Sequence, residues 1–536
     1  MERISSPIPN TLLQQYWGNE PWVSSFFPYV ITEAAFQNRL TWLNGQAYER
    51  DTLVQVIRSY MTPYGVSPKA EQHLTNLKND AVVVVGGQQT GLLTGPLFSI
   101  YKAITVILLA KQQSEILQQP VVPLFWIAGE DHDLDEINHT YTMDVDTAKK
   151  RIFGSASRIK LMASNTTFDK EQLREYVKSI FKDYGETDHS VAMLHRVLAP
   201  IETSETYTAY FSALFNELFA SEGLLLIDAA YTPFRKIQSD YFTTLIKHNE
   251  AIASNVVEQE RMLIGKGFTA PLEATIENAN IFYVQEGERF LLERKNGSFI
   301  NALKGLRFTY EELVTIAQKE PERLSNNVVT RPLMQEMTLP VLAFVGGPGE
   351  LAYWATLKTS FEAAGLQMPP FIPRLSITLV NRQAQYAMDQ TGLTVVDAFA
   401  GRIEESKVQF ISQQKNKKIT ESIEVIEQQL MDQYKTLQNL LIEEKIQLDA
   451  TLERNAQYHQ QQFDYLKRKI DERYEQRYEK VLRHMNVVQA QLMPLNKPQE
   501  RLYNLYQFEN EYGKTLVADL LNQLKPIEQS HLLIYL

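Results

Sequence analysis

The chain has 536 residues, which is too long for one compact core, so we expect two or three structural units. A net charge of −11 argues against nucleic acid or an anionic membrane surface as a partner. The absence of cysteine excludes disulfides, cysteine zinc sites and a thiol nucleophile. No window approaches the roughly 18 apolar residues of a membrane span, and no signal-peptide core is present, so the expected location is cytoplasmic.

The first predicted unit, residues 1–145, combines N-terminal helices with the first part of an α/β core. Helical patterns at residues 32–44 and 48–61, interleaved with aromatic residues, are typical of helices packed on a sheet. A β-branched run at residues 81–85 then leads into a glycine loop and an apolar helix at residues 98–117. Strand, glycine loop and helix, in that order, indicate a nucleotide-binding type of fold.

The loop at residues 86–91 reads GGQQTG, and we predict that it binds a substrate. Its glycines allow a ligand to approach the backbone and allow positive φ, while amide N–H groups and the following helix start favour an anion. The loop matches neither the phosphate-binding motif GxxxxGK[ST] nor the dinucleotide-binding motif GxGxxG, so the sequence of the loop does not identify a cofactor. The alternative is a tight turn with solvated side chains. The predicted substrate-binding residues here are Gly87, Gln88, Gln89, Thr90 and Gly91.

A second buried strand at residues 121–128 ends in a cluster of ionisable side chains, for which four interpretations compete. In the first, His132 acts as a general acid or base beside a carboxylate, and in the second, the acidic residues bind a divalent cation. In the third, a histidine donates a hydrogen bond to a phosphate oxygen. In the fourth, the acidic residues only cap the start of the following helix. We predict His132 and Asp133 as catalytic and Glu130 and Asp131 as substrate-binding, and we assign no metal ligand.

Two insertions are predicted after this strand. Residues 146–267 contain helical patterns at 171–184, 190–198 and 207–220 and one further core strand at 224–227. That strand ends in Asp228, which we predict to contact a ribose or an amine, the alternative being a turn residue. Residues 268–330 form the second, smaller insertion, with a hairpin built from strands at 281–285 and 290–294.

The core returns at residues 331–401. A strand at residues 340–345 leads into a third glycine loop at 346–350 and a helix, which repeats the earlier unit. Arg331 is predicted to hold a carboxylate or phosphate, the alternative being a salt bridge inside the core. Gly347 and Glu350 are the further substrate-binding candidates. Because carboxyl ends of parallel strands share one edge of a sheet, we expect segments 86–91, 129–133 and 346–350 to converge.

Residues 402–493 predict an antiparallel helical hairpin of coiled-coil type. From residue 402 to 492 there is no glycine or proline, and apolar residues recur with gaps of three and four. The pattern weakens at residues 449–458, where we expect the turn. Such a stripe buries best against a second copy, so we expect a homodimer. The spaced apolar residues include Ile419, Ile423, Ile426, Leu430, Leu437 and Leu440.

The last segment, residues 494–536, is predicted to return the chain to the core and to pack on it. It is rich in aromatic residues and amides. Tyr506 and Asn510 are candidates for a second nucleotide pocket that would hold an adenine ring, against the alternative of plain packing.

Four motifs, GGQQTGLLTGP, WIAGEDHDLDEINH, RPLMQEMTLP and GGPGELAYW, together with the long helical tail, resemble the bacillithiol biosynthesis cysteine-adding enzymes. The resemblance implies a Rossmann-like parallel sheet with two connecting-peptide insertions, similar to nucleotidylyltransferases and class I aminoacyl-tRNA synthetases, and a coiled coil that dimerises. It also implies the last step of bacillithiol synthesis, in which the carboxyl of cysteine is joined to the amine of glucosaminyl malate. ATP with a divalent cation is the expected energy source.

This chemistry assigns a task to each candidate. Arg331 would hold malate or phosphate, Gln88 and Gln89 would bind sugar hydroxyls, and His132 or Asp133 would take a proton from the attacking amine. Two alternatives remain: a nucleotide-binding coiled-coil scaffold with a degenerate cleft, and a metal-dependent hydrolase.

Overall fold

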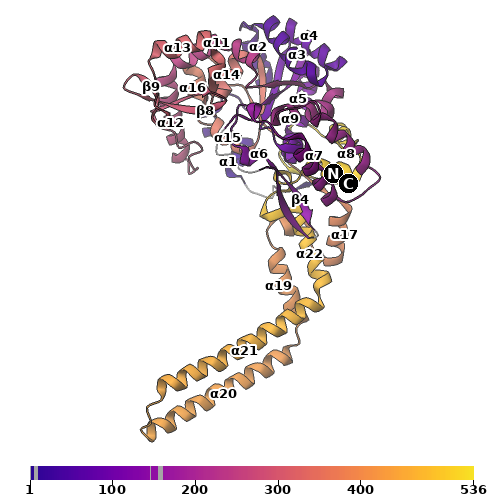
Figure 1. The fold of residues 1–536 in the computed structure, drawn as a ribbon, viewed down its shortest axis with the longest axis vertical. Coiled ribbons are helices and arrows are strands. Elements are labelled where there is room, and N and C mark those ends of the chain that lie inside the picture. Colours follow the sequence, from indigo (N-terminus) through magenta and orange to yellow (C-terminus); the bar gives the residue numbers. More distant parts are fainter. Residues whose placement is uncertain (1, 5–9, 145, 155–160) are drawn as a thin grey trace. The chain divides into compact units, whose positions relative to one another are not determined.

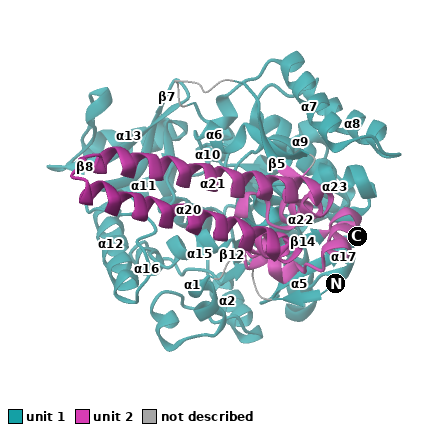
Figure 2. Cartoon of the chain, turned by 90° about the horizontal axis from the view of Figure 1, so that it is seen from below, with its two compact units in different colours: residues 1–144, 148–379, 497–536 teal, residues 145–147, 380–496 magenta. Residues whose placement is uncertain are grey.

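The computed structural model describes residues 2–4, 10–144, 146–154 and 161–536. The chain forms two compact units, shown in different colours in Figure 2. The first comprises residues 1–144, 148–379 and 497–536, and the second comprises residues 145–147 and 380–496. The predicted core segment 331–401 is therefore divided at Leu379, because helices α17 (Arg382–Thr391) and α18 (Val395–Phe399) pack on α22 (Glu479–Leu492) within the second unit.

A five-stranded parallel sheet forms the centre of the first unit, and it confirms the predicted Rossmann-like class. All four core strands expected from the sequence are present. Residues 82–85 are fully buried, as expected for a parallel strand covered on both faces. The strands, in their order across the sheet, are β13 (Phe371–Pro373), β12 (Val341–Gly346), β2 (Val82–Gln88), β3 (Val121–Ile127) and β6 (Leu225–Asp228).

Helices surround this sheet (Figure 1). The connection from β2 to β3 is the long apolar helix α5 (Leu97–Leu117), which packs on both strands. The two predicted N-terminal helices are also confirmed, as α2 (Glu33–Asn44) and α3 (Arg50–Met61), and Thr32 caps the start of α2. A further helix, α4 (Pro68–Asn79), follows them and is capped by Ser67. Further helices of this unit are α1 (Thr11–Trp17), α6 (Leu134–Ile137), α10 (Thr232–Lys236), α11 (Ser239–Lys247), α12 (Asn249–Gly265) and α14 (Thr330–Thr338).

The sheet has a topological switch point between β2 and β12. From β2 the chain continues through α5 to β3 on one side, whereas from β12 it continues through α15 (Pro348–Trp354) and α16 (Lys358–Ala363) to β13 on the other side. The two strands pair in parallel, with Val345 opposite Gly86. In open α/β sheets the loops that leave such a point in opposite directions open a crevice.

The first insertion carries its own small core. Helices α7 (Lys170–Tyr184), α8 (Ser190–Leu198) and α9 (Tyr207–Phe219) agree with the three predicted helices. Their apolar faces form a second hydrophobic cluster around Leu173, Val177 and Val197. A two-stranded sheet of β4 (His139–Asp144) and β5 (Thr147–Ile152) precedes these helices.

The second insertion is a five-stranded antiparallel sheet, larger than the predicted hairpin. The predicted turn is present, since Glu286 and Gly287 have φ values of 52° and 81°, the left-handed pair that a tight hairpin uses. The strands, in their order across the sheet, are β10 (Leu306–Phe308), β9 (Ser298–Asn301), β8 (Glu288–Lys295), β7 (Asn278–Gln285) and β11 (Leu324–Asn326). Helix α13 (Tyr310–Lys319) packs against it.

The second unit contains the predicted antiparallel hairpin, formed by α20 (Lys417–Glu443) and α21 (Asp449–Arg477) and preceded by α19 (Ile403–Gln414). An ion pair of 2.6 Å between Lys467 and Glu427 links the two long helices. The expected turn at residues 449–458 is wrong, because these residues are helical and the chain reverses at residues 444–448. Lys445 adopts φ 60° there, so the turn uses a left-handed lysine in place of glycine or proline.

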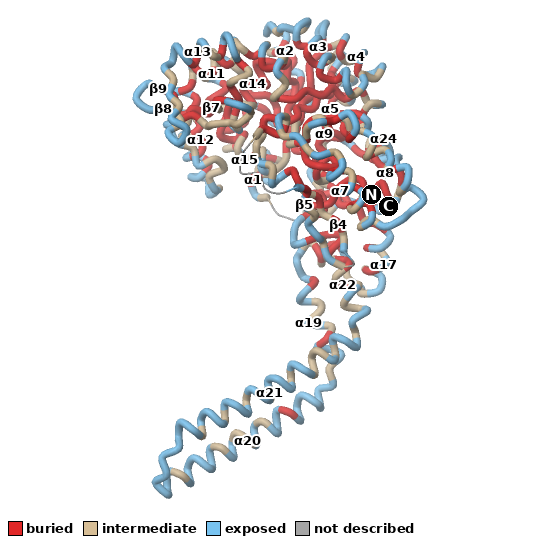
Figure 3. The backbone as a smooth tube through the Cα atoms, in the orientation of Figure 1, coloured by how far each residue is buried: buried red, intermediate tan, exposed pale blue. Residues whose placement is uncertain are grey.

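The C-terminal segment returns to the first unit as predicted. Helices α23 (Leu505–Tyr512) and α24 (Leu516–Gln523) precede β15 (His531–Tyr535), which lies between β1 (Glu2–Ile4) and β14 (Ile377–Val380) in a three-stranded sheet. Figure 3 shows that most residues of the central sheet are buried, whereas most residues of α20 and α21 are exposed. Within the described ranges, no helix has the length and apolar character needed to cross a membrane.

Candidate active site

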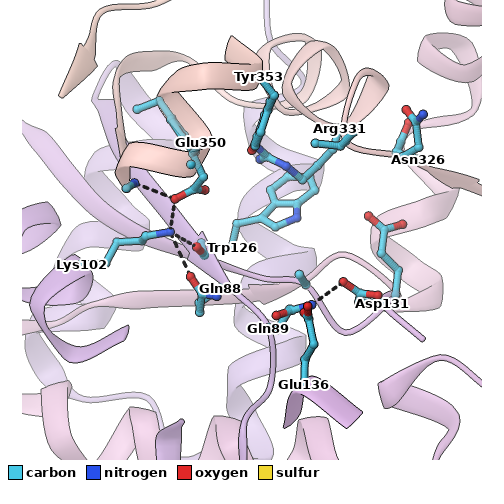
Figure 4. A pocket seen from close by; sticks show the side chains of 18 of the residues that line it. Gln88, Gln89, Lys102, Trp126, Asp131, Glu136, Asn326, Arg331, Glu350 and Tyr353 are labelled. Atoms are coloured by element: carbon cyan, nitrogen blue, oxygen red, sulfur yellow. Dashed lines mark hydrogen bonds and ion pairs between the residues drawn. The ribbon is translucent and has the colours of Figure 1, made fainter. Parts of the chain in front are cut away.

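A pocket of about 760 Å³ lies at the switch point, at the carboxyl ends of β2, β3 and β12 (Figure 4). Its wall includes residues from Gly87 to Gln89, from Glu130 to His132 and from Gly347 to Glu350. The predicted convergence of the three segments is therefore confirmed. The volume lies in the range that small-molecule sites occupy, roughly 300–1,000 Å³.

Lys102 on α5 is the most deeply buried cation of the pocket wall, with 1% of its surface exposed. Its Nζ donates to the Gly87 carbonyl at 2.6 Å, to Gln88 Oε1 at 3.1 Å and to Glu350 Oε2 at 2.6 Å. Burial lowers the pKa of Lys102, while the Glu350 carboxylate opposes that shift. Sequence reasoning missed this residue; the available signal was a single lysine within an apolar helix face.

The two predicted glutamines both line the pocket, and each has a charged partner. Gln88 accepts from Lys102, as above. Gln89 Nε2 donates to Asp131 Oδ2 at 2.7 Å and to Glu136 Oε2 at 2.6 Å. The side chains are thus held by ionic groups, and the solvated turn is excluded as a description of these two residues.

The acidic cluster after β3 divides into different tasks. Glu130 lines the pocket but is buried, and its carboxylate pairs with Arg235 and accepts from Ser325. Asp131 Oδ1 accepts from the backbone N–H groups of His132, at 2.7 Å, and of the following residue. Asp131 therefore serves both as a local cap, one of the four interpretations, and as a pocket residue through its other oxygen.

His132 lies in the pocket wall beside an arginine that the sequence analysis did not select. Arg289 on β8 places its Nη1 3.5 Å from His132 Nδ1, and its guanidinium stacks 4.0 Å over the ring of Phe282. Burial lowers the pKa of Arg289, with Glu130 and Asp131 opposing the shift. The second insertion thus contributes the Arg289 guanidinium to the pocket, and the sequence of its hairpin contains no motif that indicates this role.

Arg331, which we predict to hold a carboxylate or phosphate, lines the pocket. It donates to Gln335 Oε1 at 3.0 Å and to the Tyr353 hydroxyl at 3.2 Å, and both partners are neutral. Among the described residues neither Arg289 nor Arg331 forms an ion pair. The alternative interpretation of Arg331, a salt bridge inside the core, is therefore excluded within the described part of the chain. Arg374, a further pocket arginine, pairs instead with Glu500 at 2.8 Å.

Three buried side-chain atoms of the wall have no hydrogen-bond partner within the described part of the chain. They are the indole Nε1 of Trp126, with 1% of the residue exposed, Nε of Arg289, and Oδ1 of Asn326, with 3% of the residue exposed. Buried polar groups of this kind are costly unless a ligand or water satisfies them.

Four predicted site residues do not line the pocket. Thr90 and Gly91 are buried, and a Cβ at Gly91 would lie 2.7 Å from Gly95 Cα, so close packing occupies this stretch. Asp133 is exposed at the start of α6. Asp228 is buried and accepts from Ser164 Oγ at 2.6 Å and from the backbone of residue 230, so an internal network uses its carboxylate.

The predicted second nucleotide pocket at Tyr506 and Asn510 is corrected in the same way. Tyr506 is fully buried in the second hydrophobic cluster, with Arg196 5.5 Å from its ring, and burial raises its pKa. Asn510 donates to the Gly185 carbonyl at 3.0 Å. Both side chains belong to the packing between the C-terminal segment and the first insertion.

The glycines of the first loop serve a purpose other than the one expected. Gly86, Gly87 and Gly91 all have ordinary backbone angles, because β2 continues to Gln88. A Cβ at Gly87 would lie 2.4 Å from the Trp126 carbonyl oxygen. Gly87 thus permits the close approach of β2 and β3 at the pocket. The amide of Gly347, in the third loop, is already bonded to Glu350 at 2.8 Å.

Fold and site together define an α/β protein with a polar pocket at the switch point of a Rossmann-like sheet and with a helical hairpin. Residues 1–375 match the family described as "Bacillithiol biosynthesis BshC, N-terminal Rossmann-like domain", and residues 377–536 match "Bacillithiol biosynthesis BshC, C-terminal coiled-coil domain". The chain belongs to the bacillithiol biosynthesis BshC family.

Similar proteins cover the whole chain. One from Lysinibacillus sphaericus (strain C3-41) is 47% identical over 100% of both chains, and one from Geobacillus sp. (strain WCH70) is 38% identical over 100% of both. A third, from Bacillus velezensis, is 37% identical over 96% of this chain and 95% of its own. Each carries the name "Putative cysteine ligase BshC".

Proposed function

We propose that this protein is a cysteine ligase of bacillithiol biosynthesis that joins the carboxyl of cysteine to the amine of glucosaminyl malate. The observation that carries the proposal is the pocket at the switch point, where Arg289 and Arg331 have no ion pair among the described residues. Glucosaminyl malate offers carboxylates, hydroxyls and one amine, which match arginines, glutamines and carboxylates. The similar proteins are named putative cysteine ligases, which supports the cysteine half of this reaction.

The malate carboxylates are assigned to the arginines. A guanidinium presents a rigid fork of N–H donors that fits a carboxylate, and charge-assisted bonds of this kind contribute about 1.5–3 kcal/mol each. Arg331 is held by two neutral partners, so its charge is not neutralised locally. The Trp126 N–H, which has no partner among the described residues, is a further donor for the anion.

Amide formation also requires a neutral amine, so a proton must leave the ammonium before attack. Asp133 does not line the pocket, which removes one of the two predicted proton acceptors. Glu130 and Glu350 in the wall are paired with Arg235 and Lys102, so we assign the proton to Asp131, His132 or Glu136.

Joining a carboxylate to an amine releases water and is uphill in dilute solution, so we include ATP with a divalent cation as the co-substrate. When bound, ATP would supply the energy by phosphoryl or adenylyl transfer to the cysteine carboxylate, with ADP or pyrophosphate leaving, and the carboxylate oxygen would depart with phosphate or AMP when the amine attacks. The pocket contains aromatic side chains and arginines suited to a nucleotide. No group of three or more His, Asp and Glu residues able to hold a metal occurs among the described residues, so phosphate oxygens and water would supply most of the cation ligands.

The test uses the purified full-length protein with cysteine, glucosaminyl malate, ATP and Mg²⁺. We expect mass spectrometry to detect the amide product with one ATP consumed per bond, and no product when cysteine or ATP is omitted. In cells that lack the gene, glucosaminyl malate should accumulate. Continued formation of bacillithiol in such cells would contradict the proposal.

We also propose that the protein is a homodimer through its helical hairpin. Helix α20 leaves Ile419, Ile426, Leu437 and Leu440, which share one face of the helix, between 40% and 54% exposed. Apolar residues repeated along a helix at this exposure are typical of a coiled-coil surface that a partner helix covers. A second copy of the same hairpin supplies a matching stripe.

A further inference from the structure

The adjacent residues Gln88 and Gln89 have opposite orientations that their charged neighbours enforce. A glutamine amide carries two N–H donors on nitrogen and one acceptor oxygen, and the orientation is deduced from the partners. At the end of β2 those partners are ions, each of which can bond to only one end of an amide.

Lys102 determines the orientation of Gln88. An ammonium group is a donor only, so the atom that faces Lys102 Nζ, 3.1 Å away, must be the Gln88 oxygen. Lys102 cannot rotate away easily, because its other bonds to the Gly87 carbonyl and Glu350 hold it at 2.6 Å from each. The NH₂ group of Gln88 is therefore the end that remains for a ligand.

Asp131 and Glu136 determine the orientation of Gln89. Ionised carboxylates are acceptors only, so the atom between them must be the Gln89 nitrogen, at 2.7 Å from one and 2.6 Å from the other. A single NH₂ group supplies one hydrogen to each carboxylate. The oxygen of Gln89 is the end that remains, beside two negative charges. Figure 4 shows Gln89 next to Asp131 and Glu136, with Gln88 next to Lys102.

We propose that Gln88 and Gln89 are specificity-determining residues that recognise two different groups of the amino-sugar substrate. Gln88 acts as a hydrogen-bond donor to the substrate, and Gln89 acts as a hydrogen-bond acceptor. Gln89, together with the Asp131 and Glu136 carboxylates, selects the ammonium group, and Gln88 selects an oxygen acceptor of the sugar or of malate. This assignment rests on the proposed function for the identity of the ligand. It replaces the expectation that both glutamines bind hydroxyls in the same way.

The orientation of Gln89 is tested without any ligand. In Gln89→Glu a third carboxylate faces Asp131 and Glu136, so we expect Tm to fall by about 3 °C at pH 8 relative to wild type. Gln37→Glu, an exposed position on α2 with the same charge change, is the matched control and should match wild type. Equal melting of the two variants at pH 8 overturns the orientation.

The selectivity is tested by calorimetric binding of glucosaminyl malate and of its 2-deoxy analogue, which lacks the amine. We expect wild type to prefer the amine compound by at least about tenfold, and Gln89→Met to reduce this ratio to about threefold or less. Gln88→Met should weaken both ligands by about tenfold and keep the ratio. A preserved ratio in Gln89→Met overturns the proposal. A wild-type protein that forms no amide refutes the proposed function instead, and the melting comparison still decides the orientation.

Discussion

Lys102 Nζ and Glu350 Oε2 lie 2.6 Å apart across the topological switch point. Lys102 belongs to α5, which follows β2, and Glu350 belongs to α15, which follows β12. The same carboxylate accepts the Gly347 amide, and the same ammonium holds the Gly87 carbonyl. One ion pair therefore joins the two loops that leave the sheet in opposite directions, and it fixes the width of the pocket between them.

Removing one member of this pair should destabilise the protein. In Glu350→Ala the Lys102 ammonium remains buried without its counter-charge, and we expect the free energy of unfolding to fall by about 3 kcal/mol in urea titrations. Glu71→Ala, which breaks an exposed ion pair with Arg58, should cost less than about 1 kcal/mol. An equal decrease in the free energy of unfolding in the two variants would show that the buried pair stabilises the protein no more than an exposed pair does.

Arg331→Lys should impair catalysis and leave the fold intact. Lysine keeps the charge but cannot present the bidentate fork, so we expect KM for glucosaminyl malate to rise about tenfold or more with an unchanged Tm. Arg331→Met should be worse still. The comparison also separates an enzyme from a scaffold with a degenerate cleft, since a scaffold would tolerate both variants without any measurable change.

The stability of the protein should depend on pH through Asp228. Burial raises the pKa of this carboxyl from 3.8 to about 6. Well below pH 3.8 the carboxyl is protonated in both the folded and the unfolded chain, and it carries no penalty. As pH rises from about 4 to about 6 the carboxyl ionises in the unfolded chain before it does so in the folded chain, so stability is lost, by up to about 3 kcal/mol for a shift of this size.

Asp228→Asn removes that titration. We expect the free energy of unfolding of the variant, relative to wild type, to increase by about 2–3 kcal/mol between pH 4 and pH 7, as measured by urea unfolding at each pH. The bond to Ser164 can be remade by an amide, so the fold should persist. A difference that is constant with pH would contradict the raised pKa.

The dimer is tested on the exposed stripe of α20. Ile426 and Leu440 are 54% and 53% exposed. Replacing both by serine should convert the dimer to a monomer in sedimentation experiments, because burial of a leucine-sized side chain contributes about 1.5–3 kcal/mol. Val191→Ser, on an 83% exposed residue of α8, is the control. A wild-type chain that sediments as a monomer refutes the dimer directly.

Much of the fold was accessible from the sequence, because its strongest signals are local. The β-branched run at residues 82–85, the apolar helix after it and the repeated glycine loops each indicate one element, and parallel pairing brings their ends together. The hairpin turn was misplaced because a left-handed lysine leaves no composition signal.

The site was less accessible, since its electrostatics arise from distant pairings. Lys102 has the same appearance in a sequence as any lysine on a helix, and only the sheet brings it to Glu350, 248 residues away. Arg289 reaches His132 from a separate sheet. Conversely Asp228 looked like a ligand contact at a strand end, but its partner Ser164 lies in an insertion whose packing no periodicity specifies.

The pairing of β15 with its neighbours also has a kinetic consequence during synthesis. β14 ends at Val380 and β15 begins at His531, so roughly 150 residues must leave the ribosome before the last strand can join its sheet. At about 5–20 residues per second this interval is about 8–30 s. For that time the β14 edge of the nascent chain is unpaired by β15 and is open to pairing with other extended segments.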